Sequence, residues 1–203
     1  MNVIAYIDGF NLYHGLRSRG WRKYYWLDLW ALSERFLLEG QRLVEVVYCT
    51  AKVKGDEPAL RRQLTFIDAL KAMRPALKVV YGHYLAKQMT CHACGHAYTR
   101  HEEKMTDVNI ACHLLTDAMD DRFDVALLVS GDSDLVPPVR ISRQRWPRKK
   151  VIAVFPPNRK SDALRRMVHG QKWIAEADLR QSLLPRQVRV PSGKTLTRPQ
   201  EWT

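Results

Sequence analysis

Residues 125–134 read Val-Ala-Leu-Leu-Val-Ser-Gly-Asp-Ser-Asp, an unbroken apolar run followed at once by small and acidic residues. An apolar run of this length indicates a strand buried on both faces. The small and acidic residues permit a tight turn and a close approach of the backbone. Residues 3–11 repeat the arrangement, with Val3–Ile7 followed by Asp8-Gly9-Phe10-Asn11. Both stretches therefore predict a buried strand with a carboxylate directly after it.

The rest of the chain alternates between strand-like and helix-like hydrophobic periods. Further strands are expected at Leu43–Val53, Leu77–Leu85, Val151–Phe155 and Lys172–Ala175. Helices are expected from about Asn11, and at Leu27–Leu38, Pro58–Met73, Thr106–Met119, Asp134–Arg143 and Ser161–His169. Alternating strands and helices predict βαβ units in a mostly parallel sheet with helices on both faces. Ligands of such sheets bind outside the carboxyl ends of the strands, where the strand order reverses.

The composition indicates an ordinary soluble globular protein with one main domain. Hydrophobic residues make up 46% of the 203 residues, which is enough for a sizeable core. No stretch approaches the roughly 18 apolar residues that a membrane span needs. The first residues predict a strand rather than a secretion signal, because Asp8 interrupts a short apolar run that has no basic leader. Four cysteines suit metal binding in a reducing cytoplasm better than a disulfide framework.

The net charge of +12 is concentrated in the last third of the chain. Residues 140–203 hold 16 Lys and Arg against 4 Asp and Glu. Such a basic stretch is typical of a protein that handles a polyanion, although a solvated face that aids solubility is the alternative. A membrane partner is disfavoured because no sustained amphipathic helix with aromatic anchors is present. We expect residues 1–184 to form the folded domain and the Pro- and Arg-rich residues 185–203 to form a flexible basic tail.

A third carboxylate, Asp107, begins the predicted helix Thr106–Met119 and shares a helical face with Ala111 and Ala118. A charge at the head of a core-facing stripe is costly unless a counter-charge compensates it. Carboxylates that converge on one point call for a divalent cation, and oxygen-only ligation favours Mg²⁺ or Mn²⁺. Three structural alternatives stay open. Asp8 and Asp134 could each cap a following helix, and Asp107 could act on the helix dipole.

Three motifs in this order resemble the NYN domain family of PIN-like nucleases. They are Ile7-Asp8-Gly9-Phe10-Asn11, then Lys104 to Asn109 with Thr106-Asp107-Val108, then Ser130-Gly131-Asp132-Ser133-Asp134. The resemblance covers roughly residues 1–175 and implies a PIN-like Rossmannoid three-layer fold with Mg²⁺- or Mn²⁺-dependent ribonuclease activity. It implies that Asp8, Asp107, Asp132 and Asp134 bind metal. It also implies that Asn11 contacts a metal-bound water or the phosphate, and that Lys104, Ser130 and Ser133 contact the substrate.

Residues 91–101 read Cys-His-Ala-Cys-Gly-His-Ala-Tyr-Thr-Arg-His, within an expected Cys/His insertion at 88–102. Cys-x-x-Cys followed by Gly is typical of a zinc knuckle, in which two thiolates on a tight turn hold the metal. Cys91 and Cys94 are the secure ligands of a structural Zn²⁺ site. His96 and His101 are the nearest candidates to complete it, and His92 is an alternative. A reduced loop without metal and a redox pair are the competing interpretations.

Two groups of basic and aromatic residues are candidates for RNA contact. Arg159, Lys160 and Arg165 follow a predicted strand, so they should lie on the carboxylate side of the sheet and guide RNA. The basic residues between 143 and 150 precede that strand instead. Residues 21–26, Trp-Arg-Lys-Tyr-Tyr-Trp, could stack unpaired bases, although aromatic residues that flank a helix are more often core.

The sequence thus predicts a metal-dependent endoribonuclease. By the resemblance, water attacks the phosphate and leaves 5′-phosphate and 3′-hydroxyl ends. A nuclease for DNA and a catalytically silent RNA-binding module are the alternatives. We expect RNA as the partner, a cytoplasmic location and a possible homodimer, because PIN-like domains often pair.

Overall fold

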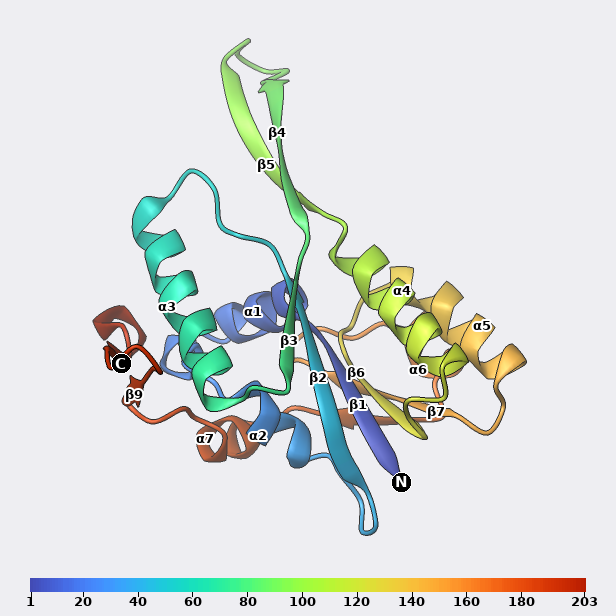
Figure 1. Cartoon of the computed structure of the whole chain (residues 1–203). Helices are drawn as coiled ribbons and strands as arrows, with labels where there is room; N and C mark the ends of the chain where they lie inside the picture. Colours follow the sequence, from blue (N-terminus) through green and yellow to red (C-terminus); the bar gives the residue numbers. More distant parts are fainter.

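In a computed structural model, a six-stranded parallel sheet with the order β3-β2-β1-β6-β7-β8 forms the centre of the molecule (Figure 1). The structure describes the backbone of residues 1–203 and every side chain except those of 84–87 and 99–103. All neighbouring strands of this sheet are parallel, which confirms the predicted α/β class. The strands are β1 Asn2–Asp8, β2 Arg42–Thr50, β3 Leu77–Tyr81, β6 Val125–Val129, β7 Lys150–Phe155 and β8 Gly170–Trp173.

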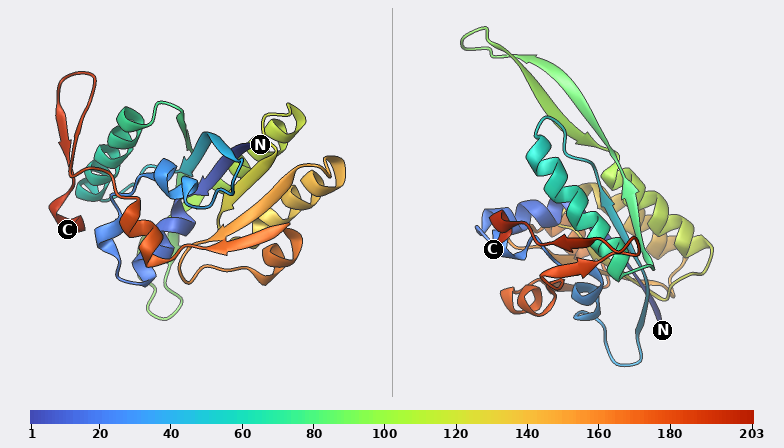
Figure 2. Two further views of the ribbon diagram at one scale, coloured as in Figure 1. Left: turned by 90° about the horizontal axis from the view of Figure 1, so that it is seen from below. Right: turned by 60° about the vertical axis from the view of Figure 1, so that its left-hand side comes forward.

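Helices cover both faces of the sheet and give three layers (Figures 1 and 2). Strand β1 shows why, because Val3, Ala5 and Ile7 belong to one buried cluster, while Ile4 and Tyr6 belong to the other. In the described part of the chain, no helix is both long enough and apolar enough to cross a membrane. One face carries α1 Gly9–Ser18, α2 Leu29–Glu34, α3 Glu57–Met73 and α7 Glu176–Gln181. The other carries α4 Thr106–Met119, α5 Val136–Arg145 and α6 Asp162–Met167.

The strand order reverses between β1 and β6, which are neighbours although more than a hundred residues separate them. Ile7 pairs with Val129 at the carboxyl end of this ladder. The chain runs outward from β1 through β2 to β3, and then from β6 through β7 to β8 on the other side. Residues that follow Ile7 and Val129 therefore meet at the topological switch point, as the sequence predicts.

The third predicted strand, Leu77–Leu85, is interrupted at Gly82, and its last three residues belong to a different strand. Gly82 donates its backbone N–H to the carbonyl of Thr50 at 2.7 Å, and β2 ends at Thr50, so the sheet offers β3 no further partner. The chain continues as a separate antiparallel hairpin of β4, His83–Thr90, and β5, Ala97–Lys104. This hairpin extends away from the body of the molecule on the side where the carboxyl ends of β1 and β2 lie (Figure 1).

The flexible tail expected at residues 185–203 is also wrong, because this segment is ordered. It forms an antiparallel hairpin of β9, Gln187–Arg189, and β10, Thr195–Thr197, that packs on α3 and ends in the 3₁₀ helix η3, Gln200–Trp202. Val188 and Leu196 are buried in the main core. Each strand is only three residues long and contributes one buried side chain. Such short strands show no detectable hydrophobic alternation in the sequence.

Candidate active site

The site centres on the hydroxyl of Ser130, which connects the carboxyl ends of β1 and β6. Asp8 is buried at the end of β1, where its Oδ1 accepts the backbone N–H of Asn11 at 2.9 Å and caps α1. Its Oδ2 accepts the Ser130 hydroxyl at 2.9 Å. The same Ser130 oxygen accepts the backbone N–H of Asp132 at 3.1 Å. One hydroxyl therefore links the two predicted motifs, and we call residues 8–11 and 130–134 together the carboxylate edge.

Asn11 and Gly131 bring a basic loop to the same place. The Oδ1 atom of Asn11 accepts the backbone N–H of Gly131 at 2.9 Å. A Cβ atom on Gly131 would lie 2.6 Å from the backbone carbon and oxygen of Arg159, so only glycine allows this approach. The loop after β7, which carries Arg159 and Lys160, thus lies against the carboxylate edge as the sequence predicts. Asn11 was expected to contact phosphate or metal-bound water, and here its amide holds the turn after β6.

Asp132 and Asp134 occupy the rim of the edge. Asp132 is half-buried, and its Oδ1 accepts the backbone N–H of Asp134 at 2.9 Å, so it caps the 3₁₀ helix η2, Ser133–Leu135. The capping role considered for Asp134 therefore falls to Asp132. Asp134 and Ser133 are exposed at the start of η2.

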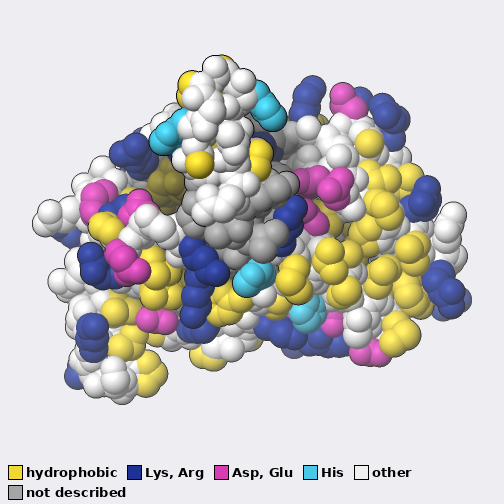
Figure 3. All heavy atoms as spheres, turned by 90° about the horizontal axis from the view of Figure 1, so that it is seen from above, with side chains coloured by type: hydrophobic (Ala, Val, Ile, Leu, Met, Phe, Trp, Pro, Cys, Tyr) yellow, Lys and Arg dark blue, Asp and Glu magenta, His cyan; other side chains and the backbone are white. Residues whose placement is uncertain are grey.

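Asp107 reaches this side of the sheet from α4. It lies half-buried in the first turn of that helix, which packs on β1, β2 and η2. Asn109 donates its side-chain amide to the carbonyl of Tyr81 at 3.4 Å, which places the turn at the carboxyl end of β3. Lys104, at the end of β5, is exposed just before the helix. Seen from this side, acidic side chains gather beside the hairpin with basic side chains around them (Figure 3).

The donor set suits a hard divalent cation without forming a ready-made cage. Within the described residues, no three His, Cys, Asp or Glu side chains are close enough together to hold a metal ion. Mg²⁺ commonly takes only one or two protein carboxylates and completes its shell with waters and substrate phosphate oxygens. Asp8 and Asp132, joined through Ser130, fit this mode of binding by their chemistry.

Charges of both signs act on the groups around the edge. Burial lowers the pKa of His14 on α1, and the nearby guanidinium groups of Arg159 and Arg17 lower it further. Burial raises the pKa of Tyr48 to about 12, and the Asp8 carboxylate contributes to this rise. Tyr48 therefore lies near the Asp8 carboxylate, and His14 lies near both Arg159 and Arg17.

The remaining basic residues divide between the two ends of the sheet. Arg165 lies on α6, which packs beside η2, and it forms an ion pair with Asp162 at 3.4 Å. At the other end, the ammonium group of Lys149 is buried and contacts Asp121 Oδ1 at 2.5 Å and the carbonyl of Phe123 at 2.7 Å. Lys149 therefore neutralises an acidic turn, and the basic residues after β7 are the better candidates for substrate contact.

Residues 91–96, for which the sequence predicts a zinc knuckle, form the tip of the β4–β5 hairpin. Backbone N–H groups of Ala93 and Cys94, and then the side chain of Cys94, lower the pKa of the Cys91 thiol. Gly95 has a φ of +70°, and its N–H donates to the Cys91 carbonyl at 2.8 Å, which closes the turn. His96 is exposed at this tip. The side chain of His101, the other expected ligand, lies outside the described residues.

The aromatic stretch at residues 21–26 has a largely structural role. Tyr24 and Trp26 are buried, and the Trp26 Nε1–H donates to the carbonyl of Pro185 at 2.7 Å. Tyr24 and Tyr25 also line a cavity, together with Tyr13, Arg17 and Trp202. No pattern in the sequence indicated Tyr13, Arg17 and Trp202, since the first two lie on α1 and Trp202 lies in the segment expected to be flexible.

Fold and site together define a nuclease-like α/β domain, with carboxylates at the switch point of a parallel sheet and basic residues beside them. The sequence profile of the NYN domain matches residues 2–171, and the chain belongs to this family. A curated protein named 6-hydroxy-3-succinoylpyridine 3-monooxygenase HspA, from Pseudomonas putida, is 26% identical over 236 aligned positions, covering 97% of this chain and 74% of its own.

A solved structure has a similar fold. A protein of unknown function, VPA0982 from Vibrio parahaemolyticus, matches with a TM-score of 0.56 and 21% identity. The match covers 90% of this chain and 96% of the other. At this identity the likeness shows the α/β architecture alone.

Proposed function

We propose that this chain is a divalent-metal-dependent endoribonuclease that hydrolyses RNA phosphodiester bonds at the carboxylate edge. The observation that carries the proposal is the Ser130 hydroxyl, which donates to Asp8 and accepts from the Asp132 backbone. Through it, two acidic motifs far apart in the chain meet at the switch point of the sheet. A basic loop beside them supplies charge for a polyanion.

The residues of the edge divide the work of hydrolysis. A Mg²⁺ or Mn²⁺ ion held directly by Asp8 and Asp132, with Asp107 and Asp134 binding its coordinated waters, would lower the pKa of a bound water and stabilise the departing oxygen. Ser130 orients the Asp8 carboxylate toward the edge. Asn11 fixes the turn that carries Asp132. The phosphate backbone of the RNA is held by Lys104, Arg159, Lys160 and Arg165. Ser133 contacts the RNA at the rim of the edge.

Cleavage of end-labelled single-stranded RNA and DNA tests the proposal. We expect RNA to be cut with Mg²⁺ or Mn²⁺ and not with EDTA, leaving 5′-phosphate and 3′-hydroxyl ends. Asp8→Asn and Asp132→Asn should each lower the rate by at least about 100-fold, more than the loss of an outer-shell partner gives. Asp120→Asn is the matched control, because Asp120 is exposed at the far end of α4. RNA binding without cleavage under any metal condition would instead favour a silent module, and preferential cutting of DNA would correct the substrate.

A second candidate function is an enzyme that acts on a small aromatic compound. Two observations favour it: the name of the Pseudomonas putida relative, and the cavity with aromatic walls that begins at Gly9. The ribonuclease is preferred because the acidic motifs and the basic excess suit a polyanion. Oxygen uptake in the presence of a two-electron reductant and 6-hydroxy-3-succinoylpyridine, together with no cleavage of RNA, would make this second function the preferred one.

We also propose a structural Zn²⁺ at the hairpin tip, held by Cys91 and Cys94 with His96 and His101 to complete it. Support comes from the two backbone N–H groups that stabilise the Cys91 thiolate and from the turn at Gly95. Such donors to sulfur and such a tight turn are what a pair of thiolates needs to hold a metal. The ion would stiffen the hairpin that leads into Lys104 and Asp107.

Metal analysis of the purified protein tests the zinc site. We expect one zinc per chain in the wild type and none in the Cys91→Ser, Cys94→Ser double variant. Cys112→Ser is the control, since Cys112 is an exposed cysteine on α4. Retained zinc in the double variant would contradict the assignment. Single alanine variants of His92, His96 and His101 then identify the remaining ligands.

A further inference from the structure

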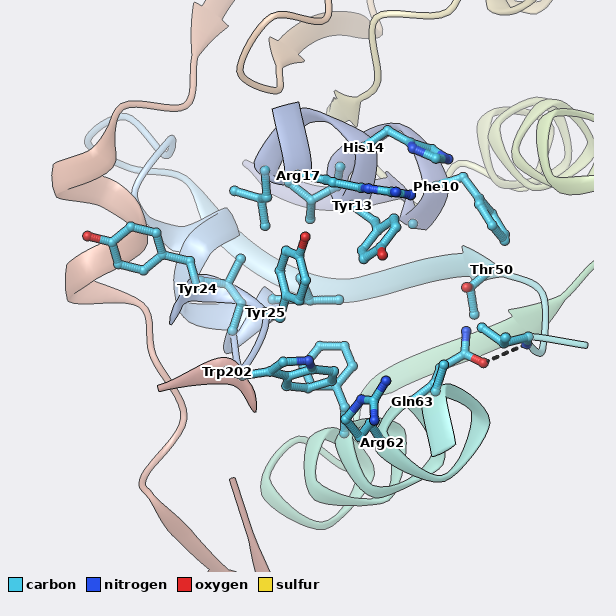
Figure 4. Close-up of a pocket in the computed structure, with 18 of the residues that line it drawn as sticks. Phe10, Tyr13, His14, Arg17, Tyr24, Tyr25, Thr50, Arg62, Gln63 and Trp202 are labelled. Carbon is cyan, nitrogen blue, oxygen red and sulfur yellow. Dashed lines mark hydrogen bonds between the residues drawn. The ribbon is translucent and has the colours of Figure 1, made fainter. Parts of the chain in front are cut away.

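A cavity of about 370 Å³ opens beside the carboxylate edge, on the face of the sheet that α1 and α3 cover (Figure 4). Its size falls within the roughly 300–1,000 Å³ range of small-molecule pockets. The wall begins at Gly9, the residue next to Asp8, and continues along α1, the end of β2, α3 and η3. An occupant of the cavity would therefore lie next to the proposed catalytic centre.

Aromatic rings form one connected wall of this cavity. The ring centroids of Tyr13 and Tyr25 are 5.0 Å apart, and those of Tyr25 and Trp202 are 5.7 Å apart. Tyr13 is 41% exposed, so its ring stands at the mouth and can receive a partner. Figure 4 shows Tyr13 and Tyr25 between Arg17 on one side and Trp202 with Arg62 on the other. Such a row of rings favours a planar aromatic occupant.

Positive charge leads from the mouth of the cavity to the carboxylate edge. Arg17 is exposed at the mouth, whereas Arg62 on α3 is paired with Glu201 at 2.9 Å. His14 lines the cavity and lies near both arginines, since burial lowers its pKa and the charges of Arg159 and Arg17 lower it further. Arg159 in turn lies against Gly131 of the edge. An occupant with an aromatic ring and successive anionic groups matches this arrangement.

We propose that the cavity binds one unstacked nucleobase of single-stranded RNA, with the adjacent phosphates running over Arg17 toward Arg159. The base stacks on the aromatic wall of Tyr13 and Tyr25, and the strand continues to the carboxylate edge. A base within a duplex could not enter, so the cavity selects unpaired RNA. That the bound nucleic acid is RNA rests on the proposed ribonuclease function, but binding to the cavity needs no metal.

Binding of a fluorescein-labelled single-stranded RNA in EDTA tests the cavity apart from catalysis. Tyr13→Ala should weaken binding by about tenfold, since one base–aromatic stack contributes about 1–3 kcal/mol. Tyr13→Phe keeps the ring and should bind within about twofold of the wild type. Arg17→Gln should weaken binding severalfold. The matched controls are Trp173→Ala and Arg180→Gln, which remove an exposed ring on edge strand β8 and an exposed charge on α7.

Photocrosslinking locates the base directly. RNA that carries 4-thiouridine should crosslink to Tyr13, Tyr25 or Trp202, as mapped by mass spectrometry of the digested full chain. Wild-type affinity in Tyr13→Ala, or crosslinks confined to the Arg159 loop, would overturn the proposal. Competition with the labelled RNA gives a further check. Uridine monophosphate should compete better than benzoate, and the reverse order would make the cavity a site for small aromatic acids.

The same experiments separate this inference from the nuclease proposal. If Tyr13→Ala weakens RNA binding but no metal supports cleavage, the base site stands and the hydrolytic function fails. If the carboxylate edge cleaves RNA, and Tyr13→Ala has the same RNA affinity and cleavage rate as the wild type, only the base site is contradicted.

Discussion

At the scale of single residues, Gly131 decides whether the basic loop can reach the carboxylates. In Gly131→Ala, the new Cβ would lie 2.6 Å from backbone atoms of Arg159, so the loop must move away. We expect a loss of stability of about 1–3 kcal/mol from this overpacking, and a weaker affinity for RNA. Urea denaturation and RNA titration measure the two effects.

Gly170→Ala is the control for Gly131→Ala. A Cβ atom on Gly170 would meet only the flexible end of the Ile152 side chain, at 3.1 Å. This variant should lose less stability and keep the RNA affinity of the wild type. Equal effects of the two substitutions would show that the backbone contact with Arg159 has no special importance.

His169 makes the stability of the fold depend on pH. Burial lowers the pKa of its ring below the ordinary value near 6.5, and Arg143 and Lys150 lower it further. The neutral ring accepts the backbone N–H of Val151 at 3.1 Å through Nδ1. The unfolded chain takes up a proton below about pH 6.5 before the folded chain does. The free energy of unfolding is therefore highest above that pH and decreases as the pH falls below it.

The measurement compares urea denaturation at pH 7.5 and pH 5.5. His169→Gln should lose less stability over this interval than the wild type, by on the order of a few tenths of a kcal/mol, because solvent screens a half-buried ring. His83→Gln, at an exposed position on β4, should lose as much as the wild type. If His169→Gln lost as much stability between these two pH values as the wild type, His169 would be excluded as the source of the pH dependence.

At the scale of elements, η3 fastens the C-terminal segment to the core. The Trp202 ring lies 6.4 Å from that of Trp26 and 6.2 Å from that of Phe66, measured between centroids. Trp202→Ala should therefore lower the free energy of unfolding by about 2 kcal/mol, less than a fully buried Trp would cost, because Trp202 is half-buried against the core. Trp173→Ala, on exposed edge strand β8, should cost less than about 1 kcal/mol. Equal losses in urea denaturation would mean that η3 adds little to stability.

Long elements with a clear period could be predicted from the sequence, and short ones could not. Helix Thr106–Met119 and strand Val125–Val129 have the predicted bounds. The last strand of the sheet was expected at Lys172–Ala175 and lies at Gly170–Trp173, since its four residues alternate between exposed and half-buried positions and carry no apolar run. The C-terminal hairpin was missed for a similar reason, because its packing on α3 is decided by tertiary contacts.

The same distinction applies to the candidate site. Asp8 and Ser130 follow buried strands, so the sequence alone placed them at one edge, and their hydrogen bond confirms that they meet. The cavity could not be predicted, because Tyr13, Tyr25 and Trp202 come together only when η3 folds back over α3 and the 3₁₀ helix η1, Arg22–Tyr24. Nothing in the local sequence near Trp202 indicates that contact.

At the scale of the whole molecule, the basic excess of residues 140–203 does not act as one surface. Arg159 and Lys160 lie at the carboxylate edge, whereas Arg148 and Lys150 lie at the opposite end of β7. Only the first pair should neutralise RNA phosphates. The dependence of RNA affinity on salt measures this, since each phosphate contact contributes about 0.7 to the slope of log affinity against log salt for single strands.

We therefore expect the Arg159→Gln, Lys160→Gln double variant to reduce that slope by about 1.4. The Arg148→Gln, Lys150→Gln double variant carries the same change of net charge and should keep the wild-type slope. If both variants reduced the slope equally, RNA would be attracted by the net charge of the molecule rather than held along a defined path. The chain would then lack the directed approach to the carboxylates that hydrolysis at the edge requires.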